Sequence, residues 1–490
     1  MSGVRSGINL HLDTIDPKTV LTVLKNQFGV DELRPRQTEI IENLLQGKHT
    51  LAVLPTGYGK SLCYQLPSQF LSGLTIVISP LISLMQDQID SLHRRGITNA
   101  TYINSSLEER ELYERGQSVR NGEVKLLYVA PERFESEHFR ALISSRKVSL
   151  VVIDEAHCVS HWGHDFRPQY RRMSKYFEQF PDSTFLALTA TATAGVKKEI
   201  VDVLSVGEVQ VIEGNLDRSN LAYKVEYAKR VKDKEPILLS QIKRFSGASI
   251  VYANSRKDCE RLSKFLNDEG VLSAYYHAGM LPSKRIKVQR DFEQGKIDTI
   301  VSTTAFGMGI DKADVRQVIH FSMPASLESY YQESGRAGRD GEYSSCTLIF
   351  QKRDLAIQKW LLDKRYPSYD QILAVYNEIR NSPGGSIHWT ELNDFSDISD
   401  QLINRSVEHL RSLNLVDFIK GSFVAPEFED VDAVGIDTEE LVLRREMDES
   451  RLASVGEYAE SNRCRRTQLI EYFDQRFKGL CSGCDVCDRF

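Results

Sequence analysis

Residues 54–61, Leu-Pro-Thr-Gly-Tyr-Gly-Lys-Ser, follow the apolar run 50–53 and have the composition of a loop that holds nucleotide phosphates. Its glycines allow a tight turn that points backbone N–H groups at phosphate oxygens. Lys60 supplies a cation for the outer phosphates, and the hydroxyl of Ser61 can bind magnesium. The residues assigned to nucleotide binding in this loop are Thr56, Gly57, Gly59, Lys60 and Ser61. Because Leu54 stands where the G-x-x-x-x-G-K-[ST] pattern has its first glycine, a chance glycine-rich turn is the alternative for this segment alone.

Two adjacent carboxylates end a second apolar run, residues 151–153, further along the chain. A carboxylate at the end of a buried strand can hold magnesium through its water ligands, a role that we assign to Asp154. Its neighbour Glu155 can orient and deprotonate the attacking water. A strand with a polar cap is the alternative for this segment alone. Together with the phosphate loop, the pair indicates ATP hydrolysis.

A third polar group, Gln332, Arg336 and Arg339, lies within residues 331–341. The two arginines are three residues apart and share one face if the segment is helical. A guanidinium stays charged and pairs with phosphate oxygens through two hydrogen bonds, so both arginines could reach a γ-phosphate, and Gln332 could contact the nucleotide beside them. If they come from a separate lobe, hydrolysis depends on lobe closure. For this string alone, a surface loop is the alternative.

Four cysteines gather near the end of the sequence: Cys464, Cys481, Cys484 and Cys487. Four thiolates can bind Zn²⁺ tetrahedrally, and a site with no open ligand position is structural. Disulfides are the alternative, which a reducing compartment disfavours. Three neighbouring arginines, Arg463, Arg465 and Arg466, could form a phosphate-binding patch or an ordinary solvated helix face.

The elements that must position these groups are strands and helices in alternation. Short β-rich runs between helical patterns predict parallel strands that are buried on both faces. The first series is 50–54, 74–79, 125–130, 149–154 and 184–189, and the second is 249–253, 272–277, 299–303, 317–321 and 346–350. We therefore expect an α/β fold of two parallel-sheet lobes. Ligands gather at the carboxyl ends of such strands, so the site should lie between the lobes.

A different pattern follows residue 350. Helices at 369–382 and 399–414, with a hairpin at 415–424, suggest a winged helix, although a small helical adaptor would leave the same pattern. One or two charged helices at 439–463 then lead to the cysteines. We divide the chain into an N-terminal extension, a first lobe, a second lobe, a winged-helix-like segment and a small helical zinc module, bounded as 1–21, 22–212, 213–355, 366–430 and 437–490.

The composition is that of a globular protein, with 41% apolar and 27% charged residues among 490. Because 62 Lys and Arg face 68 Asp and Glu, binding of nucleic acid would have to use local basic patches. No apolar stretch is long enough for a bilayer and no secretory signal is evident, so we expect a cytoplasmic protein, nucleoid-associated in a bacterium, with no membrane partner. The scattered cysteines are expected to be reduced core residues: Cys63, Cys158, Cys259 and Cys346.

The ordered motifs resemble those of the RecQ DNA helicases of helicase superfamily two. The matching residues are 28–29, 33–37, 54–61, 79–83, 154–157, 189–191, 303–311 and 332–339. The resemblance implies RecA-like lobes, a phosphate loop that commonly lacks its first glycine, and adenine recognition by Arg34 and Gln37. It implies DNA contacts at Ser79, Ser83, Asn254, Arg256, Thr303 and Thr304. It also implies that hydrolysis is coupled to movement through His157, Thr189, Thr191 and Asp311.

Residues 158–168 crowd aromatic rings and a cation beside the predicted ATP site. Bases stack on such rings for about 1–3 kcal/mol each, regardless of sequence. Trp162 and Phe166 would more often be core residues, but here they alternate with polar and charged residues. The segment resembles the aromatic-rich loop of RecQ helicases, which would report DNA occupancy to the catalytic carboxylates. We assign DNA contacts in this loop to His161, Trp162, Phe166 and Arg167.

One departure from the family concerns the order of the modules. The cysteine segment is similar to the RecQ zinc module, but here the winged-helix-like stretch precedes it, whereas in the family it follows. That this stretch takes over the role of the usual module is a hypothesis.

The sequence therefore predicts an ATP-dependent DNA helicase that uses Mg²⁺ and a structural Zn²⁺. The resemblance implies 3′ to 5′ translocation on single-stranded DNA, unwinding of forked or branched duplexes, and a role in DNA repair and recombination. An RNA-remodelling helicase is one alternative, against which the aromatic loop and the cysteines argue. A DNA-binding scaffold with a silent ATP site is another, which the intact Lys60, Glu155 and Arg339 disfavour.

Overall fold

The computed structural model describes residues 17–161, 163, 165–307, 312–393, 398–425, 435–481 and 483–489. Trp162 and Asp311, to which the sequence assigns DNA contact and coupling, lie outside the described residues. The same holds for the side chain of Ser83, for most of the N-terminal extension and for residues 426–430 of the winged-helix-like segment.

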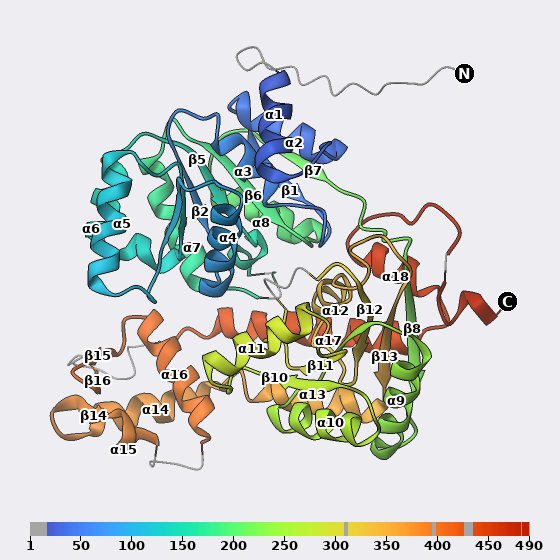
Figure 1. Ribbon diagram of the computed structural model, residues 1–490. Coiled ribbons are helices and arrows are strands. Elements are labelled where there is room, and N and C mark those ends of the chain that lie inside the picture. The colour runs from blue at the N-terminus through green and yellow to red at the C-terminus, as the bar shows by residue number, and fades with distance from the viewer. Residues whose placement is uncertain are drawn as a thin grey trace, which may run out of the picture.

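The first lobe contains a seven-stranded parallel sheet in the order β3-β4-β2-β5-β6-β1-β7 (Figure 1). Its strands are β1 His49–Val53, β2 Leu74–Ile78, β3 Ala100–Ile103, β4 Leu126–Val129, β5 Val148–Ile153, β6 Thr184–Thr189 and β7 Val209–Glu213. Its helices are α1 Pro17–Phe28, α2 Pro35–Leu45, α3 Leu62–Ser68, α4 Ile82–Arg94, α5 Glu109–Asn121, α6 Glu137–Ser144, α7 Pro168–Met173 and α8 Ala194–Leu204, with 3₁₀ turns η1 Pro131–Glu135, η2 Ala156–Val159 and η3 Ser174–Gln179.

Apolar cores cover both faces of this sheet. Along β1, Leu51 and Val53 pack into one core, while Ala52 and the following Leu54 pack into the other. Successive side chains of a strand point to opposite faces, so a strand buried on both sides is mostly apolar. This explains why the second half of β1 is an apolar run that ends abruptly at the polar phosphate loop.

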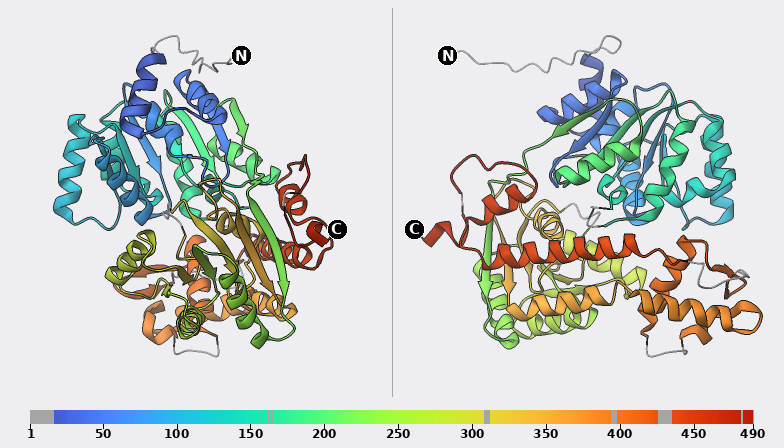
Figure 2. Two further views of the ribbon diagram at one scale, coloured as in Figure 1. Left: turned by 45° about the vertical axis from the view of Figure 1, so that its right-hand side comes forward. Right: turned by 180° about the vertical axis from the view of Figure 1, so that it is seen from behind.

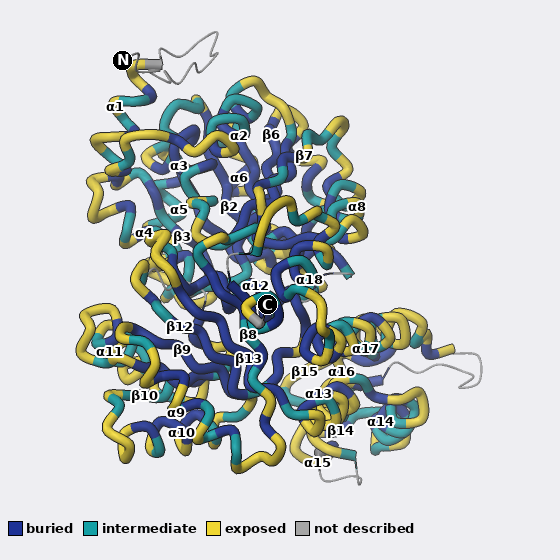
Figure 3. The backbone as a smooth tube through the Cα atoms, turned by 90° about the vertical axis from the view of Figure 1, so that its right-hand side faces the viewer, coloured by how far each residue is buried: buried dark blue, intermediate teal, exposed yellow. Residues whose placement is uncertain are grey.

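The second lobe has a six-stranded parallel sheet in the order β10-β11-β9-β12-β13-β8. Its strands are β8 Leu221–Tyr227, β9 Ala248–Tyr252, β10 Ser273–Tyr276, β11 Thr299–Ser302, β12 Val315–His320 and β13 Ser344–Phe350. Its helices are α9 Lys234–Arg244, α10 Arg256–Asp268, α11 Pro282–Glu293 and α12 Leu327–Ser334, with the 3₁₀ turn η4 Val231–Asp233. The central strands are buried beneath more exposed helices (Figure 3). The prediction of two parallel-sheet lobes is confirmed.

Three strands absent from the predicted series, β3, β7 and β8, all lie at sheet edges. An edge strand has a neighbour on one side only, so its sequence need not be apolar throughout. Accordingly, β3 has only four residues, while β7 and β8 interleave polar or charged residues with apolar ones.

After α13 Lys352–Asp363, the chain forms a segment with its own core. Its elements are α14 Tyr369–Asn381, η5 Pro383–Gly385, β14 Ser386–His388, α15 Trp389–Asn393, α16 Asp400–Ser412, β15 Asp417–Ile419 and β16 Ser422–Val424. The strands pair antiparallel in the order β14-β16-β15. The two long helices and the hairpin coincide with the predicted ones, whereas β14 and α15 are too short to leave a periodic pattern. Ile372, Ile403 and Leu410 belong to a hydrophobic cluster separate from those of the lobes.

A single long helix, α17 Glu439–Glu460, runs from this segment along the second lobe (Figure 2). It packs against α13, and its Tyr458 contacts Tyr330 of α12 at 5.4 Å between ring centroids. The last elements are α18 Arg465–Tyr472 and η6 Cys487–Arg489. Within the described part of the chain, no helix is both long enough and apolar enough to cross a membrane.

Candidate active site and strand path

A cavity of about 470 Å³ lies between the two lobes. Its first-lobe wall includes Arg34, Gln37, the phosphate loop, Asp154 and Glu155. The second lobe contributes Gln332, Arg336 and Arg339. The structure therefore brings the three polar groups found along the sequence into one site.

The phosphate loop turns through two glycines in the left-handed region, with φ of 78° at Gly57 and 84° at Gly59. A Cβ on Gly59 would lie 2.7 Å from Nε2 of Gln37, so a side chain here would displace the Gln37 amide. Nε2 of Gln37 donates to the carbonyls of Tyr58 and Gly59, and Arg34 donates to that of Gly57 at 2.9 Å. Two residues assigned to adenine recognition thus also brace the loop.

Lys60, Asp154 and Glu155 are partly or fully buried, and their charges affect one another. Burial lowers the pKa of Lys60, although the nearby carboxylates oppose this shift. Burial and the adjacent charge of Glu155 raise the pKa of Asp154 to about 7, although Lys60 opposes this shift. A divalent cation bound beside Asp154 would favour its ionised form, so a carboxylate with this raised pKa suits such a cation. Ser61 lines the same cavity, and the set of a hydroxyl and a carboxylate fits Mg²⁺.

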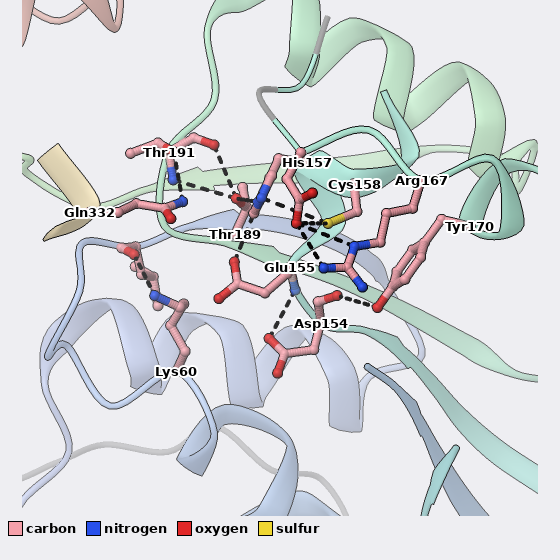
Figure 4. Close-up of polar contacts among 12 residues, drawn as sticks. Lys60, Asp154, Glu155, His157, Cys158, Arg167, Tyr170, Thr189, Thr191 and Gln332 are labelled. Atoms are coloured by element: carbon pink, nitrogen blue, oxygen red, sulfur yellow. Dashed lines mark hydrogen bonds and ion pairs between the residues drawn. The ribbon is translucent and has the colours of Figure 1, made fainter. Parts of the chain in front are cut away.

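Polar contacts connect Glu155 to the second lobe (Figure 4). Oε2 of Glu155 lies 3.4 Å from Nδ1 of His157, which hydrogen-bonds to Oγ1 of Thr189 at 3.0 Å. That hydroxyl donates to the carbonyl of Thr191, and Nε2 of Gln332 donates to Oγ1 of Thr191 at 3.4 Å. The residues assigned to coupling therefore form a path between the lobes, apart from Asp311.

The two arginines occupy different positions. A Cβ on Gly57 would lie 3.4 Å from Cγ of Arg339, so this second-lobe side chain lies against the phosphate loop. Arg336 lines the cavity but donates to the carbonyl of Gly307, at the end of the segment that follows β11. Arg339 thus lies against the phosphate loop, and Arg336 lines the same cavity.

The candidate strand contacts differ in exposure. Asn254, Arg256 and Thr304 are exposed and Thr303 is half-buried, all near the carboxyl ends of second-lobe strands. Ser79 is 1% exposed, which argues against direct contact of its hydroxyl with DNA. Arg167 donates to the carbonyl of Pro80 and links the aromatic loop to the same region.

The aromatic loop contacts α17, a contact that the sequence does not reveal. His161 and Phe166 stack at 4.4 Å between ring centroids. The guanidinium of Arg444 lies 3.9 Å from the centroid of Phe166, and its Nη2 lies 3.2 Å from Nδ1 of His161. Glu440 completes the cluster at 3.2 Å from His161. Since Arg444 and His161 are 283 residues apart, no local pattern could indicate this contact.

The four clustered cysteines come together as predicted. The sulfur atoms of Cys464, Cys481, Cys484 and Cys487 all lie within 4.8 Å of one another. Tetrahedral zinc with Zn–S bonds of about 2.3 Å requires sulfurs about 3.8 Å apart, which this cluster fits. Burial would raise the pKa of the Cys464 thiol, but hydrogen bonds from Thr467 and neighbouring cysteines lower it to about 7. The scattered cysteines are buried and free, as expected.

Two arginines beside the cluster correct a sequence interpretation. Arg465 and Arg466 are each 1% exposed, so they form neither a phosphate-binding patch nor a solvated helix face. Arg465 pairs through two nitrogens with Asp485, and Arg466 pairs with Asp217. A buried guanidinium needs such partners, and here they come from distant parts of the chain.

Three family models match the sequence. A DEAD/DEAH box helicase model matches residues 34–199, a helicase conserved C-terminal domain matches 233–341, and a RecQ zinc-binding model matches 429–488. These stretches contain the phosphate loop, the second-lobe arginines and the cysteine cluster, respectively.

Curated relatives extend this similarity. The ATP-dependent DNA helicase RecQ of Haemophilus influenzae is 37% identical over 96% of this chain and 64% of its own length. A Bacillus subtilis protein described as a probable ATP-dependent DNA helicase, RecS, is 33% identical over 92% of this chain and 88% of its own length. The chain spans 58% to 64% of the length of the first three RecQ relatives.

Solved structures support the fold. The DUF1998 helicase MrfA bound to DNA has a TM-score of 0.59 and 19% identity, over 87% of this chain and 65% of that one. At this identity the likeness concerns the fold alone.

Proposed function

Because the chain belongs to the RecQ family of ATP-dependent DNA helicases, we propose that it hydrolyses ATP to move along single-stranded DNA and separate duplexes. In this proposal Lys60 binds the outer phosphates, Glu155 activates the attacking water, and Asp154 and Ser61 hold Mg²⁺. The metal would supply positive charge beside the phosphates.

The observation that carries this proposal is the position of Arg339 against Gly57. An outer phosphate bound on the loop would meet a guanidinium from the opposite lobe, so hydrolysis would depend on how the lobes are placed. A strand held across both lobes would then advance as they close and reopen. Contacts made mainly to phosphates would give little sequence preference and strong salt dependence.

Further details of the proposal rest on the family. We propose 3′ to 5′ movement, action on forked or branched DNA, and a role in DNA repair and recombination. The location would be cytoplasmic, at the nucleoid in a bacterium, where such DNA is found. The bounds 1–21, 22–212, 213–355, 366–430 and 437–490 remain our proposed division of the chain.

We expect single-stranded DNA to stimulate ATP hydrolysis more strongly than RNA of the same sequence. The measurement is the steady-state ATPase rate with DNA, with RNA and without nucleic acid. Strand displacement on 3′-tailed, 5′-tailed and forked duplexes then tests polarity and substrate. Stronger stimulation by RNA would favour the RNA-remodelling alternative, and no ATPase activity under any condition would favour the silent scaffold.

Arg444 provides a second test because its guanidinium covers a ring on which a base is expected to stack. The Arg444 side chain is 21% exposed, and removing a partly buried cation–π contact of about 0.5–2 kcal/mol corresponds to about a two- to thirtyfold change. We expect Arg444→Ala to lower the DNA concentration for half-maximal ATPase stimulation by this factor.

A matched control for this variant is Arg445→Ala. Arg445 is the next residue of α17, but it pairs with Asp363 and Glu449, and it has no contact with those aromatic-loop residues that the structure describes. It should leave the DNA dependence unchanged. A higher half-maximal DNA concentration in Arg444→Ala would mean that Arg444 itself binds the strand and does not compete with it.

A further inference from the structure

Arg218 lies in the segment 214–220 that connects the two lobes, and its guanidinium contacts both sides of the ATP site. Nη1 donates to the carbonyl of Thr56 at 3.2 Å and to that of Gly335 at 3.3 Å. Nη2 donates to the carbonyls of Ala337 at 3.1 Å and Gly338 at 2.7 Å. Thr56 belongs to the phosphate loop, whereas the other three acceptors belong to the loop that carries Arg336 and Arg339.

These four acceptors are neutral backbone carbonyls, so Arg218 fixes the relative position of two pieces of backbone. The planar fork of a guanidinium holds several acceptors in fixed directions, which the point charge of lysine cannot do. A Cβ on Gly57 would lie 3.4 Å from Cγ of Arg339 and 3.9 Å from Nη1 of Arg218. The two arginines are thus adjacent, one over the phosphate loop and the other tying it to the second lobe.

The zinc module holds the backbone of the same connecting segment. Nη1 of Arg466 donates to the carbonyl of Arg218 at 2.8 Å and to the carboxylate of Asp217, while Nη2 donates to the carbonyl of Leu221 at 2.6 Å. Arg466 is buried and lies two residues after Cys464, so a metal bound by the cysteine cluster would fix the position of the Arg466 backbone.

Asp474 and Gln475, which follow α18, extend the contacts of the zinc module to the connecting segment and the first lobe. Oε1 of Gln475 accepts from the backbone N–H of Leu216 at 3.1 Å, and Nε2 donates to the carbonyl of Gly214 at 3.0 Å. Asp474 accepts from the backbone N–H of Ala194, at the start of α8, at 2.7 Å. The zinc module therefore contacts the first lobe, the connecting segment and the second lobe together.

We propose that Arg218 is a positioning residue for ATP hydrolysis, and that Arg466 of the zinc module holds it in place. This inference rests on the proposed function, because it concerns the rate of that hydrolysis. Arg218 sets Arg339 against the phosphate loop, and the zinc module thereby acts on turnover without touching the nucleotide. A misplacement of about 1 Å at a reacting group can cost about 10²-fold in rate.

The test compares Arg218→Ala with the parent chain in steady-state ATPase assays with single-stranded DNA. We expect kcat to fall about tenfold or more, because Arg339 is no longer held in position against the phosphate loop. Nucleotide affinity, measured with a fluorescent ATP analogue, and DNA affinity should stay within about twofold of the parent values. Arg218→Lys should not restore kcat, since an ammonium cannot hold the four carbonyls in the same directions.

A second variant tests the role of the zinc module without removing a buried arginine. Asp217→Asn keeps the side-chain size but removes the charged partner of Arg466. It should also lower kcat, by a smaller factor than Arg218→Ala does. The matched control is Arg230→Ala, an arginine of the second lobe whose side chain is 66% exposed and pairs with Asp233. This control should match the parent, and thermal melting should show all variants folded.

The outcomes separate the two proposals. If the parent does not hydrolyse ATP, the proposed function fails and the positioning role fails with it. If the parent is active and Arg218→Ala has the parent kcat, only the positioning role is overturned. A raised KM with unchanged kcat would also overturn it, since Arg218 would then contribute to nucleotide binding. A normal kcat in Asp217→Asn would overturn the part assigned to Arg466.

Discussion

Glu155→Gln is expected to bind ATP normally but to hydrolyse it about 10²–10⁴-fold more slowly, the usual contribution of a general base. The amide keeps the size of the side chain but cannot accept the proton of the attacking water. Lys60 and the phosphate loop remain, so nucleotide affinity should be preserved. Single-turnover hydrolysis and binding of a fluorescent ATP analogue, both with single-stranded DNA present, measure the two quantities separately.

Loss of unwinding should accompany this loss of hydrolysis. Glu123→Gln is the matched control, because Glu123 is an exposed glutamate of the first lobe outside the cavity. It should behave as the parent does. Retained turnover in Glu155→Gln would refute the assignment of the general base, whereas loss of ATP binding would show that the variant disturbs the phosphate loop.

Purified protein is expected to contain about one zinc ion per chain, held by the four clustered cysteines. Cys484→Ser should lower zinc affinity by well over a hundredfold, because even changes outside the ligand set cost about 10–100-fold. Structural zinc sites contribute folding free energy, so α18 should lose protection from hydrogen exchange. Elemental analysis and exchange measurements over residues 465–472 test these expectations.

The effect of the metal should reach the ATP site. Since Arg466 of α18 holds the carbonyl of Arg218, disordering α18 should also reduce ATP turnover. Cys259→Ser is the control, because Cys259 is a buried, free cysteine in α10, outside the clustered set. Zinc content well below one ion per chain in the parent, with α18 fully protected, would contradict a structural zinc site.

The central strands of each lobe can be predicted from the sequence for a physical reason. Strands such as β1 and β5 are buried on both faces, so their sequences are mostly apolar and end sharply at polar loops. The edge strands β3, β7 and β8 have no such requirement, and the short β14 and α15 give no periodic signal. Central strands and the motifs at their ends can therefore be predicted from the sequence, whereas three of the four edge strands cannot; the fourth, β10, lies in the predicted run 272–277.

The contacts of individual arginines could not be predicted from the sequence. From sequence, Arg465 and Arg466 read as a basic surface, yet both are buried because Asp485 and the segment 217–221 supply their partners. Arg218 and Arg444 carry no motif at all. Whether a guanidinium is buried, and which groups it binds, depends on the carbonyls, carboxylates and rings that surround it. These groups come from elsewhere in the chain.

By itself, the sequence determined the chemistry: a phosphate loop, a pair of carboxylates, an arginine segment and four thiols, because local spacing is enough to define each group. Only the tertiary structure decided how these groups act on one another. It placed Arg339 over Gly57, set Arg444 on the ring of Phe166, and joined the zinc module to the ATP site through Arg466 and Arg218. Such contacts join residues hundreds of positions apart, and they form only when the two lobes and the zinc module pack together.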